Sequence, residues 1–166
     1  GDIAVIFEEN KKNMNRLFRE CPRLMEIFNN RIHIPPYSED DLLGFAYANT
    51  FKDRKAYDWA VETTVYVKQG KHRMGIGKLL YDQLEKSLKG MGILNMNACI
   101  AVPVKEDGRL TDASYRFHKE MGFTLVGRFH NIGYKFNTWY DMIWMEKIIG
   151  EHDTFAPDVQ FGKWSL

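Results

Sequence analysis

The clearest periodicity in the chain follows a basic, glycine-spaced turn near the middle of the sequence. Apolar residues over positions 76–88 recur about every 3.6 residues, which predicts an amphipathic helix. Gly90 and Gly92 follow and indicate its end. Residues 60–67 (AVETTVYV), ahead of the turn, are alternating and β-branched and predict a strand. The pattern therefore predicts a strand, a tight turn and a helix in succession.

Similar patterns predict the elements on either side. Strands are expected at residues 42–48, 95–102, 123–128 and 138–149, and a short helix at 114–121 that ends at Gly122. Residues 52–57 are expected to form a turn, and a loop containing Gly133 is expected between the last two strands. Residues 151–166 have no clear period and are expected to form a surface tail.

The first forty residues fit two patterns. Residues 3–7 (IAVIF) resemble a buried strand, yet Ile3, Ile6 and Phe7 also keep helical spacing with later apolar residues, and this favours a helix. Pro22 interrupts that helix and the Pro35-Pro36 pair ends the segment. The element order predicts a single α/β domain over residues 1–150, with a mixed sheet and helices on its faces.

Composition narrows the function classes. The chain has 166 residues, of which 45% are hydrophobic, and 23 Lys and Arg against 22 Asp and Glu. Such a balance predicts no nucleic-acid partner and no anionic membrane surface. Cys21 and Cys99 lack metal-ligand or C-x-x-C spacing, so no metal site is expected. Without an apolar run of about 20 residues or a signal segment, we expect a soluble cytoplasmic protein.

The turn at residues 68–77 (KQGKHRMGIG) carries the chemistry. It leads into a helix, whose first N–H groups lack intrahelical partners and lie at the positive end of the dipole. Gly75 and Gly77 would let an anion approach the backbone, and Lys71, Arg73 and Lys78 add positive charge. An ordinary solvated loop is the alternative. The Walker pattern fails because Leu79 follows Gly77-Lys78, and the dinucleotide pattern fails because Leu80 replaces its third glycine.

The turn resembles a known family signature. HRMGIG, at residues 72–77, is similar to the [QR]-x-x-G-x-[GA] acetyl-CoA signature of the GNAT-type N-acetyltransferases. Three further stretches in the same order, at residues 54–67, 114–123 and 127–146, resemble the phosphinothricin and methionine-sulfoximine acetyltransferase branch. This resemblance, over residues 43–147, implies a mixed, mainly antiparallel GNAT sheet with helices on both faces.

The resemblance implies a coenzyme A site. The strand before the turn would pair its free backbone groups with pantetheine, and the turn would wrap the pyrophosphate. His72 stands where the family usually has Arg or Gln, and Thr111 where it usually has Asn. The implied coenzyme-binding residues are Val65, Tyr66, Val67, His72, Arg73, Met74, Gly75, Ile76, Gly77, Lys78, Thr111 and Ser114.

The resemblance also implies two catalytic residues. An amine must be neutral to attack a thioester, so an ammonium acceptor needs a base. Glu62, in the strand before the turn, matches the base proposed for this branch; a salt bridge or a solvent-facing position is the alternative. His118 stands where many relatives have a tyrosine that protonates the departing thiolate, although it could equally cap or pack the short helix.

Substrate residues follow from the same comparison. Arg54 would hold a substrate carboxylate, with Tyr57 and Trp59 beside it. Tyr134, Lys135 and Tyr140, from the C-terminal hairpin, would line the opposite wall; the phosphinothricin enzymes often have histidine in place of Tyr140. Residues 1–40 look too few for the family's first strand, two helices and substrate-covering loop, so either the strand is missing or the loop is shortened. A homodimer is expected, since dimers are common in the branch.

Three functions remain open from the sequence. The favoured one is an acetyl-CoA-dependent N-acetyltransferase that transfers acetyl directly to the amino group of a small amino-acid-like substrate. The second is the same chemistry on protein N-termini, lysine or polyamines. The third is a non-catalytic acyl-CoA-binding domain.

Overall fold

The structure is a computed structural model that describes residues 3–7, 44–67, 70, 73–104 and 110–160. It contains six strands in one sheet, in the order β1-β2-β3-β4-β6-β5. Neighbouring strands are antiparallel except for the parallel pair β3 and β4. The strands are β1 (Ile3–Phe7), β2 (Gly44–Thr50), β3 (Ala60–Val67), β4 (Asn95–Pro103), β5 (Thr124–Lys135) and β6 (Thr138–Ile148).

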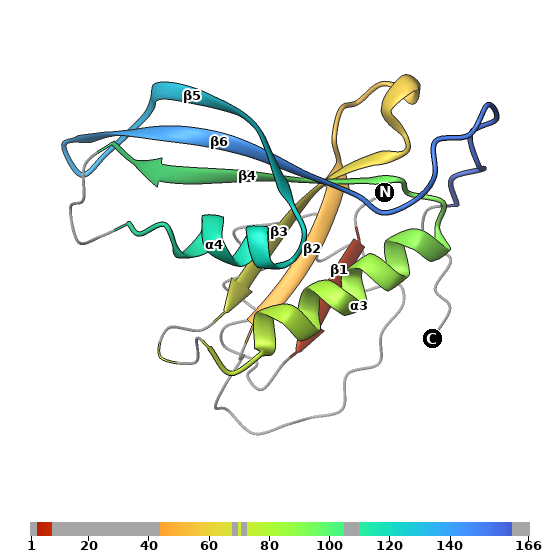
Figure 1. The fold of residues 1–166 in the computed structure, drawn as a ribbon, viewed down its shortest axis with the longest axis horizontal. Helices are drawn as coiled ribbons and strands as arrows, with labels where there is room; N and C mark the ends of the chain where they lie inside the picture. Colours follow the sequence, from red (N-terminus) through yellow and green to blue (C-terminus); the bar gives the residue numbers. More distant parts are fainter. Residues whose placement is uncertain (1–2, 8–43, 68–69, 71–72, 105–109, 161–166) are drawn as a thin grey trace.

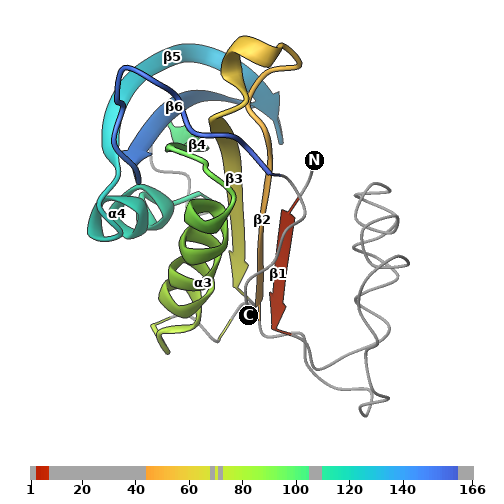
Figure 2. The same ribbon diagram turned by 90° about the vertical axis from the view of Figure 1, so that its right-hand side faces the viewer.

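The described helices lie on one face of this sheet. They are α3 (Ile76–Gly90) and α4 (Ala113–Glu120), with a 3₁₀ turn, η1 (Lys55–Tyr57), between β2 and β3. Figure 2 shows α3 and α4 on the same side of the strands. No helix within the described ranges is both long enough and apolar enough to span a bilayer.

The core lies between these helices and the sheet. α3 buries Leu80, Tyr81, Leu84 and Leu88, at the spacing that predicted the helix. They pack against alternate residues of the central strands, including Ala46, Val61 and Met96. Burying a large apolar side chain contributes about 1.5–3 kcal/mol, so this seam fixes the position of α3 beneath β2 and β3.

Two expectations need correction. Residues 3–7 form strand β1, paired antiparallel with β2, so the first strand is present. The other N-terminal elements expected before residue 43 lie outside the described residues. β5 extends to Lys135, whereas the sequence pattern placed its end near residue 128. The pattern ends early because register shifts near Val126 and between Phe129 and Gly133 interrupt the alternation of the strand.

The expected surface tail also makes specific contacts with the rest of the chain, which its sequence did not predict. The indole N–H of Trp59 donates to the carbonyl of Pro157 at 2.7 Å, and the amide of Gln160 donates to the carbonyl of Met91 at 2.9 Å. Val159 packs against the core cluster. Residues 150–160 therefore lie across the ends of α3 and β4 (Figure 1).

Candidate active site

The sheet splits between its two parallel strands. β3 and β4 pair only at Ala60↔Asn95, Val61↔Met96 and Glu62↔Asn97. Beyond Glu62, β3 stays paired with β2 as far as Val67, while β4 stays paired with β6 as far as Pro103. Figure 1 shows the two strands diverging. Backbone N–H and C=O groups on the inner edges of the split have no β4 or β3 partner, so they can bind an extended ligand.

The basic turn opens α3 beside this split. Arg73 and Gly75 both have left-handed backbone conformations, with φ of 64° and 78°. Gly75 is the N-cap residue and has no side chain with which to cap the helix. The first-turn N–H groups of Ile76, Gly77 and Lys78 therefore face outward at the positive end of the helix dipole. This geometry can bind an anion.

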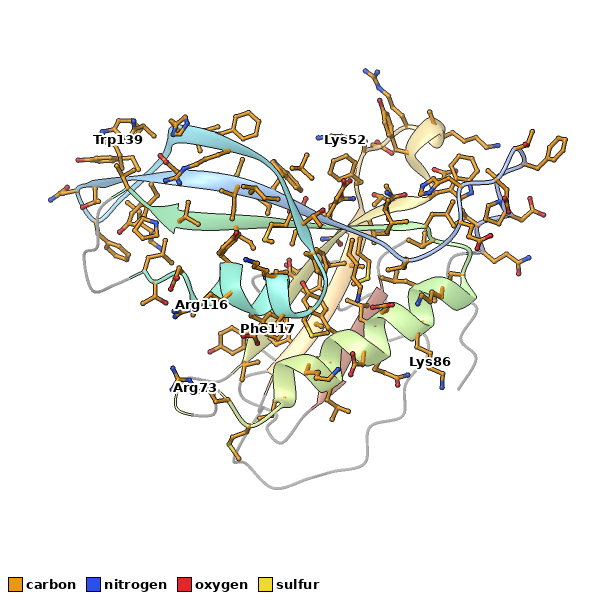
Figure 3. The ribbon with its side chains drawn as sticks, in the orientation of Figure 1. Lys52, Arg73, Lys86, Arg116, Phe117 and Trp139 are labelled. Carbon is orange, nitrogen blue, oxygen red and sulfur yellow. The ribbon has the colours of Figure 1, made fainter. Side chains whose placement is uncertain are left out.

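Glycine is needed at the two positions of the turn, 75 and 77, for different structural reasons. A Cβ on Gly75 would meet nothing within 4 Å, so its positive φ is what requires glycine there. A Cβ on Gly77 would lie 3.1 Å from the Phe117 ring of α4. Gly77 therefore lets α4 pack onto the first turn of α3, a role that the sequence interpretation of an anion approach did not include. Figure 3 shows Phe117 of α4 lying toward this end of α3.

Glu62 lies at the point where the strands part. Its neighbours in register are Asn97 on β4 and then Glu146 on β6, so the three side chains lie on one face, opposite α3. The Asn97 amide is fixed by a 3.1 Å hydrogen bond to the carbonyl of Val61. Burial raises the pKa of the nearby Cys99 thiol, and the Glu62 charge raises it further. Glu62 is half-buried. Its carboxylate acts electrostatically on Cys99 of β4.

A cavity of about 380 Å³ lies on the same face of the sheet, beside the paired ends of β3 and β4. Its lining includes Asn97, two carboxylates and three aromatic rings. The carboxylates are Glu146 and Asp153, and the rings are Phe51, Tyr57 and Trp59. The split and the turn could hold an extended anionic ligand, and the cavity, which Asn97 lines at the last β3–β4 pair, could hold a second, smaller one.

A family comparison agrees with this geometry. The acetyltransferase (GNAT) domain family matches residues 23–144, which is most of the chain. The chain belongs to this GNAT family.

Several GNAT relatives have named activities. A phosphinothricin N-acetyltransferase from Streptomyces viridochromogenes is 39% identical over 104 residues, which is 63% of this chain and 53% of the relative. An L-methionine sulfoximine/L-methionine sulfone acetyltransferase from Salmonella typhimurium is 31% identical over 124 residues, covering 73% of this chain and 67% of the relative.

A solved GNAT structure gives the same fold. The phosphinothricin acetyltransferase from Sinorhizobium meliloti, in complex with acetyl-CoA, has a TM-score of 0.59 and 30% identity, over 73% of this chain and 60% of that one. The chain thus spans about half the length of the Streptomyces relative.

The structure describes the remaining predicted coenzyme residues except His72. Val65, Tyr66 and Val67 lie on β3 beyond its pairing with β4. Met74 is exposed in the turn, while His72 lies outside the described residues. The hydroxyl of Thr111 accepts a 3.3 Å hydrogen bond from the amide of Ala113, so it caps the start of α4.

His118 is buried with both ring nitrogens engaged. Nδ1 donates to the carbonyl of Ser114 at 2.7 Å, which leaves neutral Nε2 to accept from the hydroxyl of Tyr81 at 2.8 Å. Tyr81 also contacts the hydroxyl of Thr63 at 3.2 Å, and Thr63 donates to the carbonyl of Asn97 at 3.0 Å. Burial lowers the pKa of His118 and raises that of Tyr81. This placement favours the packing alternative for His118 over direct proton donation.

The predicted substrate residues separate into two groups. Tyr57 and Trp59 line the cavity, and Arg54 is exposed at the start of η1 without lining it. Tyr140 pairs with Pro103, six positions along β4 from Asn97, which is about 20 Å of strand. Tyr134 and Lys135 lie at the same hairpin end, where Figure 3 labels Trp139. One chain therefore does not bring these three residues to the cavity.

Sequence reasoning missed two charged groups. Glu146 joins the row only through the register of β4 with β6, a signal that one sequence does not carry. Asp141 is buried and accepts hydrogen bonds from Arg128 Nε at 2.7 Å and from the amide of Asn131 at 2.7 Å. The Asn131 amide, followed by Arg128 and His130, holds the pKa of Asp141 below its usual range. The basic residues Arg128 and His130 on β5 could have indicated that a carboxylate lies beside them.

Proposed function

We propose that this protein is an acetyl-CoA-dependent N-acetyltransferase that acts on the amino group of a small amino-acid-like substrate. The named activities of the Streptomyces and Salmonella relatives support the reaction class. The observation that carries the proposal is the split of β3 from β4 directly beyond Glu62 and Asn97. An enzyme of this kind needs a donor channel and a base at the same point, and the split provides both.

The residues present fit coenzyme A. The unpaired inner edge of β3, over Val65, Tyr66 and Val67, suits the two amides of pantetheine. The first-turn amides of α3, with Arg73 and Lys78, suit the pyrophosphate. When bound, the coenzyme would supply an activated acetyl thioester and a thiolate leaving group. Ser114, exposed on the first turn of α4, would lie beside the coenzyme arm.

Glu62 acts as the general base. It accepts a proton from the ammonium of the acceptor, directly or through one water, and so frees the nitrogen lone pair for direct attack. No covalent enzyme intermediate is formed. The fixed amide of Asn97 beside Glu62 positions the acceptor at the point where the strands part. His118, Tyr81 and Thr63 hold α4 and β4 in place around that point.

The test combines turnover with binding. Glu62→Gln should lower kcat for thiol release from acetyl-CoA by about 10²–10⁴-fold, the usual contribution of a general base, with the Kd for coenzyme A unchanged by calorimetry. Glu120→Gln, at an exposed position of α4, is the matched control and should retain activity. Full activity in Glu62→Gln would remove Glu62 from the chemistry. Coenzyme binding without turnover on any acceptor would support a non-catalytic binding domain.

We also propose a homodimer in a cytoplasmic setting. Support for the dimer comes from β5, an edge strand with large exposed apolar side chains, namely Leu125, Val126, Phe129 and Ile132. Exposed apolar surface of this kind often marks an interface. Light scattering coupled to size exclusion should give twice the mass of the chain, and Phe129→Asp should yield the monomer. A monomeric wild-type protein would exclude this assignment.

A further inference from the structure

The cavity is lined by Asn97, the register partner of Glu62, but not by Glu62 itself, and one of its walls lies outside the family match. The match ends at residue 144, whereas Glu146, His152, Asp153 and Ala156 all line the cavity. Three of these residues belong to the C-terminal segment, which is held by the Trp59 bond to Pro157 and by a 2.8 Å bond from His152 Nε2 to Asn95 Oδ1. The segment is therefore a fixed wall of the cavity.

The backbone also fits this placement. Gly92 follows the C-terminus of α3 with φ of 83°, and a Cβ there would lie 2.6 Å from the carbonyl oxygen of Asp158. Residues 150–160 thus approach the main chain of the α3–β4 turn closely. Asp153, in the same segment, lines the cavity.

The lining has the chemistry of a cation site. Apart from His152, the described residues that line the cavity are neutral or acidic, with the carboxylates of Glu146 and Asp153 and the rings of Phe51, Tyr57 and Trp59. An ammonium ion is attracted both by carboxylates and by the faces of aromatic rings. The nearby ammonium of Lys52 already lies 5.1 Å from the Phe51 ring centroid. Arg54, which would suit an anionic group, does not line the cavity.

We propose that this cavity binds a second cationic group of the acceptor, so that the preferred substrates are basic amino acids or diamines. The inference rests on the proposed acetyltransferase function and names the acceptor class of the same site. One amine of the acceptor lies at Glu62 and receives the acetyl group. The other group, still protonated, lies between Glu146 and Asp153 against the aromatic rings.

The kinetic test compares acceptors that differ by one ammonium group. L-lysine is paired with L-norleucine, and 1,5-diaminopentane with pentylamine, with kcat/KM measured by thiol release. Wild type should prefer the acceptor with the additional ammonium group in each pair by at least about tenfold, the ratio that 1.4 kcal/mol gives. Glu146→Gln and Asp153→Asn should each reduce that preference severalfold, and the double variant should abolish it, with little change for L-norleucine and pentylamine.

Controls separate the possible results. Glu151→Gln makes the same charge change in the same segment, at an exposed residue that does not line the cavity, and should keep the wild-type preference. Thermal melts of every variant check the fold. Equal use of the two acceptors in each pair, or a preference unchanged in the double variant, would overturn the inference.

A binding measurement keeps the test independent of turnover. Calorimetry with 1,5-diaminopentane alone should show binding to wild type and Glu151→Gln, and at least tenfold weaker binding to the double variant. If this pattern holds while no acceptor is acetylated, the proposed function fails and the cation site stands. If acetylation occurs but the diamine binds the double variant as well as wild type, the cation site fails and the proposed function stands.

Discussion

Tyr81→Phe tests the buried polar chain that joins β3, α3 and α4. The substitution keeps the ring, which stacks on Phe117 and Phe123 with centroids 5.5 and 5.7 Å away, and removes only the hydroxyl. His118 Nε2 then loses its 2.8 Å partner while 4% of the His118 side chain remains exposed. Thr63 keeps its bond to the carbonyl of Asn97. The change therefore isolates one buried, unpaired nitrogen.

The expected magnitude follows from that nitrogen. Leaving a buried acceptor unpaired costs about 1–3 kcal/mol. For a chain of 166 residues, a loss of about 2 kcal/mol lowers Tm by about 4–8 °C. The assay is differential scanning calorimetry at pH 7.5, with urea unfolding for the free energy. Tyr134→Phe, at an exposed position, is the control and should leave Tm unchanged. A Tm for Tyr81→Phe within 1 °C of wild type would refute the assigned hydrogen-bond chain.

Three further predictions concern other contacts. Because burial lowers the pKa of His118, the unfolded chain binds more protons just below the ordinary value of 6.5, so unfolding free energy should fall as pH drops from 7 towards 5; His118→Gln should flatten that slope in urea titrations, and an unchanged slope would contradict the assignment. Lys147→Met should lower the free energy of unfolding in urea by about 1–2 kcal/mol, because Glu85 loses its 2.5 Å partner but keeps Lys89. Since these partners lower the pKa of Glu85, the difference from wild type should vanish as pH falls well below 4.5. A difference that grew at low pH would contradict the assigned ion pair. Gly92→Ala should cost about 1–2 kcal/mol for its positive φ and speed proteolysis within residues 150–160, whereas Gly127→Ala, with open space around its Cβ, should do neither; equal protection of both variants would disprove the close approach of the segment.

Elements with a single consistent period could be predicted from the sequence. α3 follows its apolar spacing, and β3 follows its alternation. β1 could not be distinguished from a helix, because apolar residues at positions 3, 6 and 7 satisfy both periods; its pairing with Ala46 and Ala48 of β2 decides the outcome. The end of β5 was missed because two register shifts interrupt the alternation that marks a strand. Local sequence patterns therefore predict the elements that are regular along their length, and they fail where pairing with a neighbouring strand introduces a register shift.

The candidate site shows where local patterns stop. The turn at Gly75 could be predicted because all of its determinants are adjacent in sequence. The arrangement of Glu62 and the cavity depends instead on two strand registers, Glu62 with Asn97 and Asn97 with Glu146, and on the hydrogen bond between Trp59 and the C-terminal segment. Residues 62, 97, 146 and 153 come from four separate parts of the chain. A shift of one residue in either strand pair would put Glu62 and Glu146 on opposite faces of the sheet. The place of Glu146 in the cavity is therefore set by strand register, and that of Asp153 by the contacts of the C-terminal segment, neither of which a local sequence pattern specifies.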